Sequence, residues 1–110
     1  MDRIDKINAE IKRQLAEKIS YGVKDPRLHS GMVSILRVDT TKDLKYCKVY
    51  FSVIGSSGEE ALSALRKAAG YIRGELSGKL TVRCVPELQF VLDDSIEYSI
   101  RLDKILKDLK

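Results

Sequence analysis

Basic side chains gather around a run of small residues in the second half of the chain, and this pattern could bind phosphates. Small side chains let another molecule approach the backbone closely, and Gly70 costs a helix roughly 1 kcal/mol relative to alanine. We therefore expect a break between two helical runs here, with a free helix N-terminus that favours anions. The predicted phosphate-binding surface comprises Arg66, Lys67, Ala68, Ala69, Gly70, Arg73, Lys79 and Arg83.

Two simpler interpretations of this stretch stay open. Gly70 could merely let two helices turn a corner, and a solvated helix face would also carry arginine and lysine. Tyr71, beside the expected break, is a candidate for stacking on a base, whereas packing explains most aromatic residues of the predicted strands. Lys42 and Lys45, in a predicted loop, could also reach a ligand. The formal net charge of +4 leans toward an anionic partner.

Residues that could support catalysis or hold a metal do not form the pattern of a reactive site in the sequence. The single histidine, His29, lies in a polar segment without a partner that the sequence can place beside it. The adjacent Asp93 and Asp94 favour a helix cap over metal ligation. Cys47 and Cys84 lack the spacing of a zinc or redox motif, so we expect buried, reduced thiols. The sequence predicts no enzyme, metal or cofactor, and a small α/β hydrolase stays the weaker alternative.

The elements that position these residues follow from the spacing of apolar side chains. Apolar residues at three- and four-residue intervals predict a helix over 3–21 that ends near Gly22. β-branched and aromatic residues predict strands over 32–38 and 46–54 and a third strand over 88–92. The short polar link between the first two strands makes antiparallel pairing the default.

Three further helical runs complete the predicted order. Ser56 or Ser57 offers an N-cap for a helix that runs to the expected break, and a second run continues beyond the break through Leu80. Asp94 or Ser95 can cap a last helix with an apolar face. Helices on one face of a small three-stranded sheet, an α+β fold, are therefore expected in a single domain over 1–110. No apolar run is long enough to span a bilayer, and the chain is expected to be cytoplasmic, without a membrane partner.

Four motifs in order cover nearly the whole chain. They are Lys24-Asp25-Pro26-Arg27, the segment 43–50, Ala68-Ala69-Gly70 and the segment 85–95. Together they resemble the bacterial ribosome-binding factor A family. The resemblance implies a type II KH-like domain in which an Ala-x-Gly kink replaces the usual Gly-x-x-Gly, followed by a C-terminal helix.

The resemblance also implies a function, a partner and a surface. Such a factor is not an enzyme; it binds the immature small (30S) ribosomal subunit and its 16S rRNA, assists maturation of the 5′ end region, and supports growth in the cold. A ribosome-associated GTPase would promote its release, and we expect a monomer. The implied RNA surface is the kink with Lys67 and Arg73, extended to Arg66, Lys79 and Arg83, with Lys24 and Arg27 as additions. A KH-like protein-interaction module is the alternative.

Overall fold

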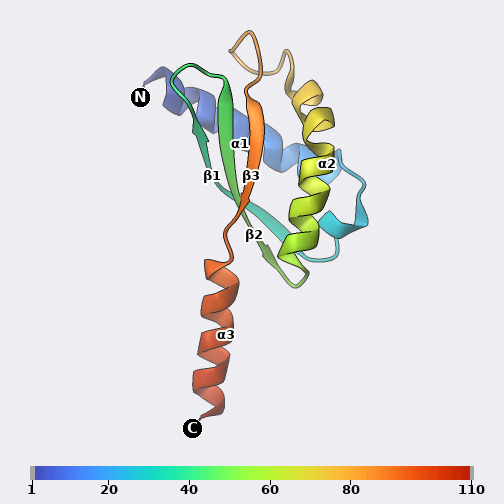
Figure 1. Cartoon of the computed structure of the whole chain (residues 1–110), viewed down its shortest axis with the longest axis vertical. Helices are drawn as coiled ribbons and strands as arrows, with labels where there is room; N and C mark the ends of the chain where they lie inside the picture. The colour runs from blue at the N-terminus through green and yellow to red at the C-terminus, as the bar shows by residue number, and fades with distance from the viewer. Residues whose placement is uncertain (1, 110) are drawn as a thin grey trace.

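The computed structural model describes residues 2–109, without the side chains of 96–99, and its described part is an α+β fold (Figure 1). The helices and strands are α1 (Arg3–Tyr21), the short 3-10 helix η1 (Pro26–Leu28), β1 (Met32–Thr40), β2 (Tyr46–Ile54), α2 (Gly58–Leu76), β3 (Glu87–Leu92) and α3 (Ser95–Asp108). The three predicted strands are confirmed, as is the first helix with its end at Gly22.

The sheet places β2 between its two neighbours. β1 pairs with β2 in antiparallel fashion, as predicted, whereas β3 runs parallel to β2. A parallel partner requires a crossover connection, and α2 together with the segment 77–86 supplies it. The register between β1 and β2 shifts between Ile35 and Arg37, which is a β-bulge. The parallel pairing of β3 with β2 places the start of β3 beside the end of the β1–β2 loop.

One face of the sheet holds the hydrophobic core, and α1 and α2 cover it (Figure 1). Phe51 of β2 is fully buried and meets Phe90 of β3 edge to face, with ring centroids 6.4 Å apart. The expectation of helices on one face holds for these two helices. α3 instead extends away from the body of the molecule (Figure 1). The core side chains of the helices are Ile7, Ile11, Leu15 and Ile19 of α1 and Ala61, Ala64, Leu65, Ile72 and Leu76 of α2.

The predicted break between two helices at Ala68-Ala69-Gly70 is wrong, whereas a kink within one continuous helix stays a prediction. α2 runs without interruption from Gly58 to Leu76, and Gly70 lies inside it. Leu65 and Ile72 are both fully buried on either side of this point, so packing holds the chain helical despite the local cost of glycine. No second helix N-terminus exists here, and the anion-binding N–H groups expected from it are absent from the described chain. The KH-like assignment stays a prediction.

The second helical run was also expected to reach Leu80, but α2 ends at Leu76. Gly78 follows with a φ of +80°, a left-handed conformation that glycine adopts without strain, and the chain turns away from the helix axis there. The segment 77–86 is therefore irregular. Cys84 lies in it and is exposed, which corrects the expectation of a buried thiol in a strand. Cys47 is buried in β2 as predicted, and burial raises the pKa of its thiol to about 11.

The helix caps at α2 and α3 lie at predicted residues, and the two caps differ in which side chain accepts the hydrogen bond. The Ser57 hydroxyl accepts a hydrogen bond from the Glu60 N–H, 3.3 Å away, as a capping residue should. At α3, Asp93 Oδ1 accepts from the Ser95 N–H at 2.9 Å, whereas Asp94 makes no side-chain capping bond. Asp94 is the N-cap residue of α3, as predicted, but the side-chain hydrogen bond at the start of the helix comes from Asp93, the other predicted capping acid. Ile96, predicted on the apolar face of this helix, falls outside the described side chains.

Candidate nucleic-acid interface

The solvent side of α2 carries the main part of the predicted surface. Because the core residues of α2 all project toward the sheet, the helical period places Arg66, Lys67, Gly70 and Arg73 on the opposite, exposed side. We call these four residues the α2 outer face. Ala68 and Ala69 are half-buried and pack against the core instead. The structure therefore brings together four of the eight predicted residues along one exposed helix surface.

The backbone of α2 is open to approach at its glycines. A Cβ atom built on Gly70 or Gly74 would meet nothing within 4 Å. A shallow hollow of about 370 Å³ lies beside them, lined also by Arg73, Ser77 and Val85. A sugar-phosphate chain could thus lie directly on the helix, next to cations.

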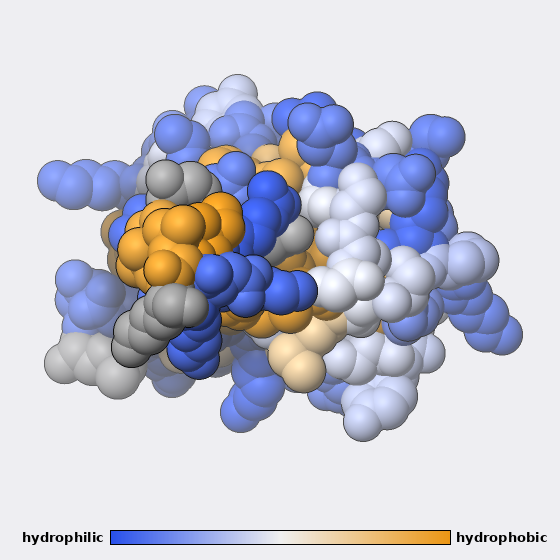
Figure 2. Space-filling view, turned by 90° about the horizontal axis from the view of Figure 1, so that it is seen from below, coloured by the Kyte–Doolittle hydropathy of each residue, from blue (hydrophilic) through white to orange (hydrophobic). Residues whose placement is uncertain are grey.

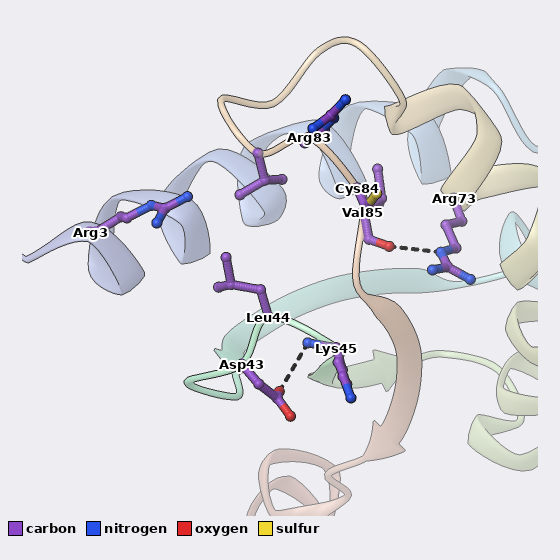
Figure 3. Close-up of a pocket in the computed structure, with 9 residues that line it drawn as sticks. Arg3, Asp43, Leu44, Lys45, Arg73, Arg83, Cys84 and Val85 are labelled. Carbon is purple, nitrogen blue, oxygen red and sulfur yellow. Dashed lines mark hydrogen bonds between the residues drawn. The ribbon is translucent and has the colours of Figure 1, made fainter.

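Arg73 links the α2 outer face to the irregular segment 77–86. Its Nε donates a hydrogen bond to the Val85 carbonyl oxygen at 2.9 Å. This bond fixes the guanidinium between the hollow at Gly70 and a second pocket (Figure 3). Arg73 therefore borders both cavities.

The second pocket has a volume of about 350 Å³ and a basic lining. Arg73 and Arg83, both predicted from the sequence, lie around it together with Lys45 and Arg3 (Figure 3). Sequence reasoning included Lys45 as a loop lysine but missed Arg3, since nothing in the sequence relates the start of α1 to the loop at Arg83. The remaining lining residues are Asp43, Leu44, Val82, Cys84 and Val85.

Lys79 lies apart from the pocket, on the side of α1. The ammonium group of Lys18 in α1 lowers the pKa of the Lys79 ammonium group. Lys18 in turn lies 3.9 Å from the Glu75 carboxylate. Lys79 therefore belongs to a contact between α1 and the end of α2, and the structure does not join it to the cations around Arg83.

Lys24 and Arg27, the two additional candidate RNA-binding residues before β1, differ in how accessible their charged groups are. Arg27 binds Asp25 through its Nη2, 2.8 Å from Oδ2, and through its Nε. These hydrogen bonds from Arg27 lower the pKa of Asp25 to about 2, so the pair is ionised near neutral pH. Lys24 is exposed. The structure thus gives Arg27 a local structural role and leaves Lys24 accessible.

Residues that the enzyme alternative would need have structural roles. His29 Nε2 lies 2.6 Å from the Val23 carbonyl oxygen, and Asp93 caps α3. Among the side chains that the structure describes, those of 2–95 and 100–109, no group of three or more His, Cys, Asp and Glu residues is arranged to hold a metal ion. No helix in the described part of the chain is long and apolar enough to cross a bilayer.

Comparison with known proteins identifies clear relatives. The family model described as "Ribosome-binding factor A" matches residues 3–106. A ribosome-binding factor A from Acetivibrio thermocellus is 46% identical over 110 residues, which cover 98% of this chain and 89% of the relative.

Solved structures of ribosome-binding factor A also match this chain. The crystal structure of ribosome-binding factor A from Thermus thermophilus matches with a TM-score of 0.73 and 30% identity, covering 81% of this chain and 93% of that one. A homology model of the Thermus thermophilus ribosome-binding factor A, fitted into a cryo-EM map of a 30S complex, matches with a TM-score of 0.66 at 30% identity. It covers 79% of this chain and 91% of the other.

Proposed function

This chain belongs to the ribosome-binding factor A family, and from that premise we propose that it binds the 16S rRNA of the small ribosomal subunit and assists late maturation of that subunit. A relative of the same family has been fitted to a 30S complex, which supports the small subunit as the partner. We extend the proposal to processing of the 5′ end region of 16S rRNA, to a role in the cold, to release aided by a ribosome-associated GTPase, and to action in the cytoplasm as a monomer.

The observation that carries the proposal is the α2 outer face beside the basic pocket. Arg66, Lys67 and Arg73 project into solvent next to two glycines whose backbone is open, so phosphates can reach both cations and helix surface. Phosphate contacts supply affinity with a steep salt dependence, while shape and single-stranded segments of the rRNA supply selectivity.

Binding alone can drive the maturation step. A protein that binds one rRNA conformation more tightly than another shifts the equilibrium toward the favoured conformation, by no more than that difference in affinity. The protein would hold immature rRNA in one arrangement and leave once the mature fold weakens its site. No covalent chemistry by the protein is required.

Sedimentation of a lysate that contains the tagged protein tests the proposal directly. We expect the protein to travel with free small subunits at low salt and to return to the top of a sucrose gradient at high salt, because counterions compete for the phosphate contacts. Protein that stays at the top of the gradient at low salt would contradict ribosome binding.

One observation favours the alternative of a protein-interaction module. α3 exposes large apolar side chains, and Figure 2 shows apolar surface gathered where this helix is seen end-on. Association through these residues would resist both salt and RNase. The same gradient therefore separates the two functions. The exposed residues are Ile100, Leu102, Ile105, Leu106 and Leu109.

Gly70→Ala is expected to stabilise the protein and weaken its binding to small subunits. Alanine in an exposed helix interior should raise the free energy of unfolding by about 0.5–1 kcal/mol, since a Cβ meets no obstacle here. The same methyl group would occupy the space that a sugar-phosphate chain needs. Urea unfolding and gradient co-sedimentation measure the two effects.

Ser20→Ala, in the exposed part of α1, is the control for Gly70→Ala because it improves helix propensity away from the α2 outer face. It should leave subunit binding unchanged. Full binding by the Gly70 variant would show that no partner approaches the α2 backbone at this point.

A further inference from the structure

The basic pocket combines cations from four separate segments of the chain. Arg3 comes from α1, Lys45 from the β1–β2 loop, Arg73 from α2 and Arg83 from the segment 77–86. Within the described residues, none of these four side chains forms an ion pair. Like charges held near one another are unfavourable unless an anion joins them.

The single carboxylate of the pocket is already engaged. Asp43 Oδ1 accepts hydrogen bonds from the Thr41 hydroxyl at 2.6 Å and from the Lys45 N–H at 3.1 Å. These bonds lower the pKa of Asp43 and tie its charge to the backbone of the β1–β2 turn (Figure 3). The Asp43 side chain therefore shapes the turn, and the lining keeps an excess of positive charge.

The turn that carries Lys45 is held in an unusual conformation. Leu44 has a φ of +61°, which is rare for a branched side chain and is found where surrounding contacts enforce it. The Leu44 N–H donates to the Thr41 carbonyl oxygen at 2.9 Å. The Lys45 carbonyl oxygen accepts from the Glu87 N–H, also at 2.9 Å, which attaches the turn to β3.

The segment that carries Arg83 is also anchored, although it has no regular secondary structure. The Thr81 N–H and hydroxyl both donate to Glu10 Oε2 of α1, at 3.2 and 3.0 Å. Val82 and Val85 are buried on either side of Arg83. Packing and hydrogen bonds thus fix the backbone at Arg83 as well as at Lys45 and Arg73.

We propose that this pocket binds a backbone phosphate of the bound RNA, with Lys45 and Arg83 as its main ligands and Arg3 as a third. The inference rests on the proposed function and specifies a second contact for the same RNA. Figure 3 shows Arg3 and Arg73 at opposite ends of the pocket, with Lys45 and Arg83 on opposite sides. Their long, flexible stems let the charged groups of Lys45 and Arg83 turn toward a shared oxyanion.

The size and position of the pocket suit a phosphate with its attached sugar. Its volume of about 350 Å³ lies at the lower end of ligand pockets, which span about 300–1,000 Å³. Arg73 borders both this pocket and the hollow at Gly70. An RNA strand on the α2 outer face therefore passes Arg73 to reach the phosphate pocket.

The test uses the full chain, a short single-stranded oligouridine, and the variant Lys45→Ala with Arg83→Ala. Loss of the one phosphate contact that these two side chains share should reduce the magnitude of the salt slope of log K by about 0.7, measured by fluorescence anisotropy. Lys12→Ala with Arg13→Ala, in the exposed part of α1, removes the same two residue types elsewhere and should leave the slope unchanged.

Cys84 supplies a local readout because its thiol is exposed in the pocket lining, while Cys47 is buried. Bound oligouridine should slow alkylation of Cys84 by iodoacetamide severalfold in the wild type and much less in the Lys45/Arg83 variant. Oligouridine with a 5′-phosphate or a 5′-hydroxyl should protect Cys84 equally. Protection that requires the 5′-phosphate would overturn the assignment to a backbone phosphate.

Different outcomes separate the pocket from the proposed function. Suppose that the Lys45/Arg83 variant binds RNA with the wild-type slope, that RNA leaves Cys84 alkylation unchanged, and that wild-type protein still sediments with small subunits. The pocket proposal then fails while the ribosomal function stands. If the alanine pair does not fold by circular dichroism, Lys45→Gln with Arg83→Gln keeps most of each stem and takes its place.

Discussion

Replacing Arg66 and Lys67 together by alanine is expected to weaken binding to small-subunit rRNA roughly 25-fold at about 0.1 M salt. Each phosphate contact with a single strand contributes about 0.7 to the salt slope, so two lost contacts reduce its magnitude by about 1.4. Both side chains lie on the α2 outer face and form no ion pair within the described residues. Titration of labelled rRNA fragments over a range of salt concentrations measures the slope.

Lys12→Ala with Arg13→Ala is the matched control. It removes an adjacent lysine and arginine from the exposed side of another helix, so the change in net charge and in helix propensity is the same. The control should bind rRNA nearly as well as the wild type. Equal losses in the two variants would mean that net charge, and not the α2 outer face, determines affinity.

Phe51→Ala is expected to lower the free energy of unfolding by about 3–5 kcal/mol, as large-to-small changes in buried aromatic residues do. Phe51 lies on the central strand, has no exposed surface, and packs edge to face against Phe90. The change removes a large part of the roughly 5–15 kcal/mol that stabilises a typical domain. Urea denaturation followed by circular dichroism gives the value.

Phe51→Leu keeps most of the buried apolar volume and should cost clearly less than Phe51→Ala. A destabilisation below about 1 kcal/mol for the alanine variant would contradict full burial of the ring, because the lost transfer free energy remains even where the core collapses. Subunit binding by the Phe51 variants should follow the folded fraction, since the ring has no access to solvent.

Most of the secondary structure could be predicted because local patterns agree with packing. The apolar stripe of α1 and the alternation in β2 each match the face that the structure buries. The prediction of a helical break at Gly70 was wrong because the free-energy cost of glycine in a helix is small compared with the gain from burying Leu65 and Ile72. That burial keeps α2 continuous. The prediction of a buried Cys84 was wrong because the short alternation of apolar residues in the segment 77–86 resembles a strand, but the segment does not pair with the sheet.

Only part of the candidate interface could be predicted from the sequence, and the reason differs from that for the secondary structure. Sequence neighbours on one helix, such as Arg66, Lys67 and Arg73, share a face that periodicity determines. The pocket depends on which loops meet, and Arg3 reaches Arg83 only through the packing of α1 beside the segment 77–86. Lys79 follows Gly78, whose left-handed conformation ends the helical periodicity, so its place outside the pocket lining was not visible in the sequence.

The parallel pairing of β3 with β2 has a consequence for a chain that is still being synthesised. The hydrogen bond between the Glu87 N–H and the Lys45 carbonyl forms only after α2 and the following segment have left the ribosome that makes them. Pairing across such a long crossover is slow relative to local helix formation. A nascent chain therefore forms the α2 outer face before it completes the phosphate pocket. Its RNA-binding surface should accordingly form in two stages, the second at the end of synthesis.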